Sequence, residues 1–187
     1  MKWLCLSAIA LAPLGCGAAS LTSLNLDPGK TAIHFTLHDP LHTVHGTFQL
    51  KRGSIQFDPE SGNAWGEIVV DAASGESGSS ARDRRMHKDI LQSMRFPEIS
   101  FVPSHVDGKL PARGDTRMDV HGMLNLHGAG HEMTLHFQVQ RAGGDYTAST
   151  HFTIPYVEWG LKDPSNFLLK VEKAAEIDIQ TTLHAVT

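Results

Sequence analysis

Residues 118–139, MDVHGMLNLHGAGHEMTLHFQV, decide the fold because apolar and polar residues alternate along both halves of the stretch. The apolar positions of the two halves are Met118, Val120, Leu124, Leu126, Met133, Leu135, Phe137 and Val139. A period of two over this length is typical of strands with one apolar face. Residues 128–130 (Gly-Ala-Gly) predict the turn between the strands. The stretch is therefore expected to form a long β-hairpin that needs other strands to cover its apolar face.

The rest of the chain supplies strands of the same kind. Alternation predicts them at residues 33–38, 44–50, 54–57, 65–71, 99–107, 146–154 and 175–185. Arg52-Gly53 is expected to turn the chain between two of them. About eight strands at hairpin spacing favour an all-β, closed antiparallel barrel in a single domain. Such a barrel has an interior that side chains fill or that holds one small ligand.

One short helix interrupts the strands. Ser80 precedes it, and Asp83 follows three residues later, which is the spacing of a capping box. Met86 and Ile90 share one side of the expected helix, and the opposite side is basic. With only about three turns, the helix needs to dock against the barrel to be stable.

The first residues predict an export signal. Lys2 precedes an almost wholly apolar run over residues 3–14, and small residues follow. We expect a signal peptide over residues 1–19, cleaved before Ser20, and a domain over 20–187 in the periplasm or outside the cell. In an alternative interpretation, Leu14-Gly15-Cys16 is a lipoprotein box that gives a lipid anchor at Cys16. Both cysteines precede Ser20, so the expected mature chain has no disulfide and no thiol nucleophile.

Composition excludes some classes of partner. The net charge is −4, so there is no basic excess to attract a nucleic acid. No second apolar run approaches the length of a membrane-spanning helix. No nucleophile elbow, phosphate-binding glycine loop or paired carboxylates suggest catalysis, so we do not expect an enzyme.

The 12 histidines are the most unusual feature of the composition. His34, His38, His42 and His45 cluster in the sequence, and His127 and His131 flank the expected hairpin turn. Converging imidazoles bind zinc or copper, so a His-dependent metal-binding protein or hydrolase is one hypothesis. Most of them alternate with apolar residues, however, and would face solvent on a barrel. Residues 131–136 also miss a zinc-protease motif by one position and predict a strand, so no metal site is expected.

The order of the segments resembles the YceI-like family of secreted proteins that bind lipids or polyisoprenoids. The resemblance rests on the order and spacing of residues 26–28 (LDP), 33–38 (IHFTLH), 44–48 (VHGTF), 53–58 (GSIQFD), the Arg82-Asp83 helix start, 86–91 (MHKDIL), 96–101 (FPEISF), 120–128 (VHGMLNLHG) and 159–161 (WGL). It implies an extended lipocalin-like barrel that sequesters or transports a long amphiphile, of polyisoprenoid or fatty-chain type, in its interior. No other cofactor is implied.

The resemblance and the alternation together give candidate lipid-binding residues. They are Phe35, Phe48, Phe57, Phe101, Val120, Leu124, Leu135, Phe137, Phe152, Ile154 and Trp159. Arg82 and Asp83 are the candidate head-group residues, with an ordinary capped helix as the alternative. A barrel that packs on itself and binds nothing fits the same periodicity. The alternative function is a stress or redox accessory protein whose lipid is an isoprenoid quinone. A homodimer and a membrane-associated partner are left open.

Overall fold

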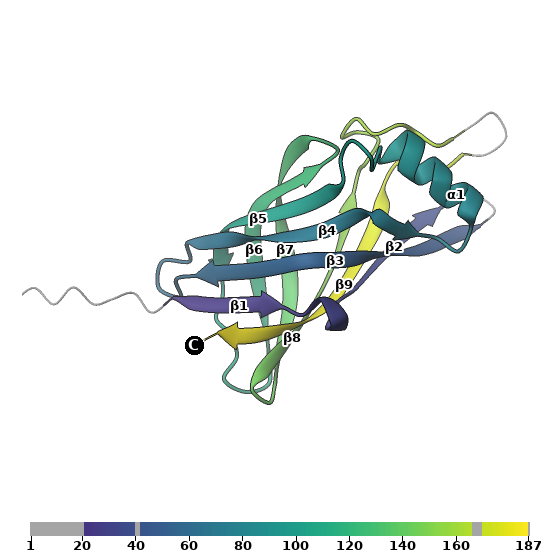
Figure 1. The fold of residues 1–187 in the computed structure, drawn as a ribbon. Helices are drawn as coiled ribbons and strands as arrows, with labels where there is room; N and C mark the ends of the chain where they lie inside the picture. The colour runs from purple at the N-terminus through teal and green to yellow at the C-terminus, as the bar shows by residue number, and fades with distance from the viewer. Residues whose placement is uncertain (1–20, 40–41, 166–169, 187) are drawn as a thin grey trace, which may run out of the picture.

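A computed structural model of the chain describes residues 21–39, 42–165 and 170–186 and shows an all-β barrel with one short helical segment at one end (Figure 1). The expected signal peptide, the alternative anchor Cys16 and Ser20 lie outside the described residues. The strands are β1 (Thr22–Leu26), β2 (Ala32–His38), β3 (Thr43–Phe57), β4 (Ala64–Glu76), β5 (Glu98–Asp107), β6 (Asp115–Leu126), β7 (Ala129–Ala142), β8 (Asp145–Ile154) and β9 (Ala175–Val186). No helix in this part of the chain is both long and apolar enough to cross a bilayer.

All strand pairings are antiparallel, and they close the sheet into a ring. The order is β1-β3-β2-β9-β8-β7-β6-β5-β4, with β4 paired back to β3. β1 and β2 both bridge β3 and β9, at opposite ends of those long strands. They therefore share one of eight positions in the barrel and are separated by the 3-10 turn η1 (Pro28–Lys30). The predicted fold class is confirmed.

Several boundaries predicted from sequence were wrong, and a bulge explains one of them. Residues 44–50 and 54–57 belong to one 15-residue strand, β3, and a register shift lies between Leu50 and Arg52, where a turn was expected. In β5, a similar shift lies between Pro103 and His105. A bulge adds a residue to one strand and interrupts the alternation without ending the strand. β1 was missed because it contributes only two inward apolar residues.

The central hairpin forms as predicted, but its turn lies one position earlier. Leu126 pairs with Ala129, so the turn consists of His127 and Gly128, with φ of 53° and 79°. Two residues with positive φ form the tight turn that matches strand twist best, and His tolerates this region better than most residues. Ala129 and Gly130, expected in the turn, begin β7.

The helical segment consists of α1 (Ser80–Arg85) and a turn of π-helix, η2 (Met86–Ile90). The predicted capping box is wrong. Ser79 is the N-cap, without a side-chain bond, and Asp83 accepts hydrogen bonds from the backbone N–H (2.9 Å) and hydroxyl (2.5 Å) of Ser77. The acidic side chain thus ties the helix to the chain that leaves β4, rather than closing the helix's own first turn.

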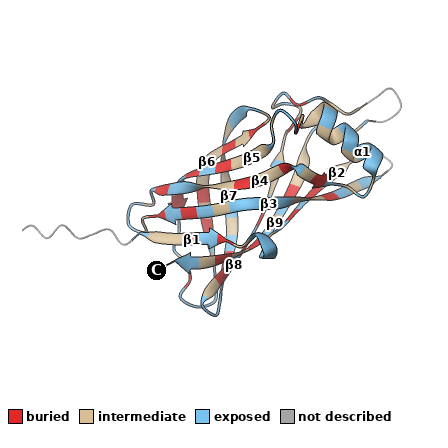
Figure 2. Cartoon of the chain, in the orientation of Figure 1, coloured by how far each residue is buried: buried red, intermediate tan, exposed pale blue. Residues whose placement is uncertain are grey.

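The barrel interior divides into a packed half and a hollow half. Figure 2 marks buried residues in red along the strands, and the buried side chains at the end away from α1 close the interior there. They include Leu24, Ile55, Phe57, Ala64, Val106, Met118, Val120, Val139, Tyr146 and Leu183. Some inward-facing residues nearer α1, among them Phe48, Phe137 and Phe152, are only partly buried, although they lie on the same inner face. The alternation is thus the same along the barrel, whereas the packing is not.

Two phenylalanines of β3 test this division. Phe57 is 2% exposed in the packed half, so Phe57→Ala is expected to lower the free energy of unfolding by about 3–5 kcal/mol. Phe48 already faces open space, so Phe48→Ala should cost less than about 2 kcal/mol. Equilibrium unfolding in urea measures both. Equal losses would contradict a hollow half.

Candidate functional site

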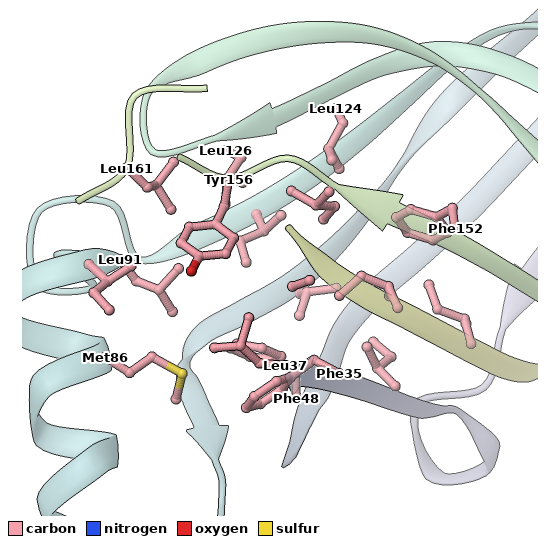
Figure 3. A pocket seen from close by; sticks show the side chains of 18 of the residues that line it. Phe35, Leu37, Phe48, Met86, Leu91, Leu124, Leu126, Phe152, Tyr156 and Leu161 are labelled. Atoms are coloured by element: carbon pink, nitrogen blue, oxygen red, sulfur yellow. The ribbon is translucent and has the colours of Figure 1, made fainter. Parts of the chain in front are cut away.

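The hollow half of the barrel encloses a cavity of about 350 Å³. Figure 3 shows labelled side chains from strands, cap and connecting loop turned toward one space. The strands contribute mainly apolar side chains: Ile33, Phe35, Leu37, Val44, Phe48, Leu50, Ile68, Val70, Ile99, Phe101, Leu124, Leu126, Leu135, Phe137, Phe152, Ile154, Ile177 and Ile179. At the inner end, the hydroxyls of Thr31 and Thr181 lie 2.7 Å apart and hydrogen-bond to each other. The volume falls at the small end of the ~300–1,000 Å³ range of ligand sites.

Two glycines leave space for the aromatic wall. A Cβ on Gly46 would lie 2.2 Å from Cζ of Phe35, and one on Gly75 would lie 2.5 Å from Cε1 of Phe48. The rings of Phe35 and Phe48 pack against each other, with centroids 5.4 Å apart. Any larger residue at 46 or 75 would therefore push a ring out of its place.

The helical segment and the loop after β8 cap the cavity. Met86, Ile90 and Leu91 face the cavity from the helical side, and Tyr156 and Leu161 face it from the loop. The Tyr156 hydroxyl donates a 2.5 Å hydrogen bond to the carbonyl of Glu172. Burial, followed by the nearby Asp163 and Glu172, raises the pKa of Tyr156 to about 12. The cap therefore presents a neutral, mostly apolar surface to the cavity.

Polar side chains gather where the cavity reaches the surface. Arg82, Arg85, Ser77 and Asp39 line this edge, and both arginines are exposed. Arg82 donates to the Ser77 hydroxyl (2.7 Å) and carbonyl (2.6 Å), which uses two of its five N–H groups. Arg85 donates to the Pro164 carbonyl at 2.8 Å. The opening thus combines an apolar interior with two guanidinium groups at its rim.

The structure brings most of the predicted site residues together. Those that line the cavity are Phe35, Phe48, Phe101, Leu124, Leu135, Phe137, Phe152, Ile154 and Arg82. Phe57 and Val120 instead lie in the packed half. Trp159 stacks on His131, and Asp83 binds Ser77, so neither lines the cavity.

Sequence reasoning missed the cap and one arginine. Met86 and Ile90 were predicted to share an apolar side of the helix, but nothing in the sequence said that this side faces a cavity. Arg85 was expected on the basic side of the helix, away from Met86 and Ile90, yet it lines the rim of the cavity. Tyr156 and Leu161 come from an irregular segment with no periodic signal.

Most of the histidines lie on the outer face of the barrel rather than in one site. Several pair with carboxylates of neighbouring strands: Asp119 with His136 (2.7 Å), Asp107 with His121 (2.8 Å) and Asp178 with His151 (2.9 Å). His131 is an exception, because it pairs in register with inward-facing Leu124 and stacks on Trp159 at 3.9 Å. Within the described ranges, no three His, Cys, Asp or Glu side chains gather closely enough to hold a metal ion.

The fold and the cavity define a class of β-barrel with an apolar internal chamber that opens at one capped end. Comparison with known proteins places the chain within this class. It belongs to the family described as the YceI-like domain, whose model matches residues 24–183. The resemblance inferred from the sequence motifs is therefore confirmed.

Individual relatives agree with this assignment. A UPF0312 protein of Vibrio parahaemolyticus is 29% identical over 142 residues, which cover 74% of this chain and 72% of that protein. The crystal structure of BcnA from Burkholderia cenocepacia has a TM-score of 0.68 at 19% identity, covering 84% of this chain and 98% of that one. A polyisoprenoid-binding domain from Saccharophagus degradans has the same TM-score and identity, covering 87% and 98%. At these identities the structural likeness shows the fold.

One surface histidine predicts how stability depends on pH. His184 donates hydrogen bonds to the carboxylates of Asp145 (2.9 Å) and Asp27 (3.3 Å), which raise the pKa of His184 above its ordinary 6.5. The protonated imidazole therefore stabilises the fold fully below pH 6.5, and this contribution is lost as pH rises through the folded pKa.

We expect the free energy of unfolding of the wild-type protein to exceed that of His184→Gln most below pH 6.5. This difference should shrink toward alkaline pH. Urea unfolding at several pH values measures this. His45→Gln is the control, since His45 contacts only the Thr36 hydroxyl (3.1 Å) among the described hydrogen bonds. A constant gap for His184→Gln would contradict the linkage.

Proposed function

We propose that this protein binds a long-chain amphiphile, of polyisoprenoid or fatty-chain type, inside its barrel and sequesters or transports it without chemical change. The observation that carries the proposal is the apolar cavity, whose walls come from strands around the ring and whose rim carries Arg82 and Arg85. Membership of the YceI-like family supports it, as does the likeness to a domain described as polyisoprenoid-binding.

The energetics favour a long chain. Burying one CH₂ contributes about 0.8 kcal/mol. Association costs at least about 4 kcal/mol, and micromolar binding needs about 8 kcal/mol net. A ligand held almost entirely by apolar contact therefore needs roughly fifteen buried methylene groups. The cavity offers few polar partners away from its rim, so a short polar metabolite would leave its own hydrogen-bonding groups unpaired.

The proposal includes location and chemistry. We infer that the chain acts in the periplasm or outside the cell, because residues 1–19 have the pattern of an export signal. A non-catalytic role suits a cavity wall whose described residues are mostly hydrocarbon.

Native mass spectrometry of the mature protein, produced with its own signal, tests the proposal directly. We expect an added mass that organic extraction releases as a lipid. An apo mass that takes up neither geranylgeranyl phosphate nor a C18 fatty acid, each offered from ethanol, would overturn the proposal and leave a barrel that binds nothing.

Two neighbouring residues of β8 provide matched variants. Phe152 faces the cavity, whereas Thr153 is exposed on the outer face. Phe152→Glu should lower the affinity for either probe at least about tenfold, because a chain would be buried against a carboxylate. Thr153→Glu adds the same charge outside and should leave binding unchanged. Fluorescence displacement of a bound polyene fatty acid measures both.

An uncharged variant provides a second test in case Phe152→Glu does not fold. Ile154→Trp adds volume within the cavity, so it should shift the preference toward shorter chains while the protein stays folded by circular dichroism. Uptake that is unaffected by both Phe152→Glu and Ile154→Trp would place the lipid elsewhere.

The arginines at the rim predict head-group preference. A charge-assisted hydrogen bond contributes about 1.5–3 kcal/mol, so Arg85→Gln should weaken geranylgeranyl phosphate binding about tenfold and geranylgeraniol binding little. Arg84→Gln is the control, because Arg84 lies on the same helix but not at the rim. Titration calorimetry with both probes measures the difference. Equal losses for phosphate and alcohol would exclude a head-group role.

A further inference from the structure

We propose that the outer side of the helical cap docks the barrel on an anionic bilayer. The docking patch consists of Arg84, Lys88, Met94 and Arg95, all exposed. This inference rests on the proposed function, since it names the surface from which a lipid enters the cavity.

The first observation is a fully exposed apolar side chain. Met94 is 99% exposed, well above Leu21 (52%), Trp65 (49%) and Val186 (49%), the next most exposed large apolar residues in the described part of the chain. Gln92, in the turn before Met94, has a left-handed backbone conformation (φ 48°). The Gln92 carbonyl accepts hydrogen bonds from Arg95 N–H (2.7 Å) and Phe96 N–H (2.9 Å). A hydrogen-bonded turn thus presents Met94 to the surroundings.

The second observation is positive charge without carboxylate partners. Residues 82–95 carry five basic and two acidic residues in a chain whose net charge is −4. Elsewhere Arg52 is held by Glu67 and Glu98, both at 3.0 Å. By contrast, Arg84 and Lys88 form no ion pair with any residue that the structure describes, and Arg95 lies 5.0 Å over the ring of Phe96. Free positive charge beside an exposed apolar side chain complements an anionic lipid surface.

The third observation is the position of the cavity. Met86, Ile90 and Leu91 line it from the same short segment that carries Arg84 and Lys88 on its other side. Arg82 and Arg85, which lie on the same helical segment, line the rim of the cavity. A barrel that docks through this patch would bring the opening close to the lipid head groups, and an amphiphile would avoid crossing bulk water. A second copy of the chain fits less well, because a symmetric contact would oppose like charges.

The expected binding is weak and reversible, as a carrier requires. Each basic side chain near an anionic surface strengthens binding about fivefold. The attraction is screened as salt rises, because the Debye length falls to about 3 Å at 1 M.

Vesicle sedimentation of the mature protein tests the proposal. We expect binding to vesicles of phosphatidylcholine with 30% phosphatidylglycerol, at least tenfold weaker binding to pure phosphatidylcholine, and loss of binding in 0.5 M NaCl. The double variant Arg84→Gln/Lys88→Gln should bind at least tenfold more weakly, and Met94→Ser should bind several-fold more weakly. Both should take up geranylgeranyl phosphate from ethanol as wild type does.

Matched controls come from the opposite end of the barrel and from the outer wall. Lys109→Gln/Arg113→Gln removes the same charge from the exposed β5–β6 loop, and Trp65→Ser removes another exposed apolar side chain. Neither should change vesicle binding, and equal losses in patch and control variants would overturn the proposal. Uptake from ethanol without binding to anionic vesicles would overturn docking alone. Vesicle binding without uptake would support docking and overturn the proposed function.

Discussion

Closure of the sheet is the constraint on which the rest of the structure depends. Because β4 pairs back to β3, each position in the ring has hydrogen-bonded neighbours on both sides, and the apolar faces of all strands meet in one interior. The closure depends on β1 and β2 together, since each covers only part of the long edges of β3 and β9. Neither short strand alone would fill that position.

A closed ring also explains how an apolar cavity persists in water. An open sheet could collapse its hollow end by bending, but the hydrogen bonds of a barrel hold the walls apart. The packed half supplies the contacts that stabilise the ring, with Phe57 at its centre. The other half can therefore leave Phe48 and Phe152 partly uncovered, and small residues at Gly46 and Gly75 keep the aromatic wall in place. Stability and binding are thus assigned to different ends of one interior.

Strand periodicity predicts which face a side chain occupies but not how far along the barrel it lies. This is why Phe35, Phe137 and Phe152 were correctly expected in the interior while Phe57 and Val120, on the same inner face, lie outside the cavity. The bulges in β3 and β5 and the turn at His127 depend on backbone geometry that alternation does not encode. The cap escaped prediction for a further reason. An amphipathic helix reveals its apolar side, but the surface against which that side packs is set by the tertiary fold.

The charged side chains are arranged differently on the barrel wall and on the cap. On the barrel wall, histidines and aspartates pair with one another across strands, as Asp119 and His136 do. On the cap, the basic residues have no such partners within the part of the chain that the structure describes, and their apolar neighbours either face the cavity, as Met86 does, or stand free in solvent, as Met94 does. Exposed apolar surface is costly to hold in water, and exposed positive charge without a partner attracts an anionic surface. The exposed apolar side chain and the positive charge occur together, beside the only rim where guanidinium groups of the described chain meet the cavity. This arrangement fits an end of the barrel at which lipid enters and leaves.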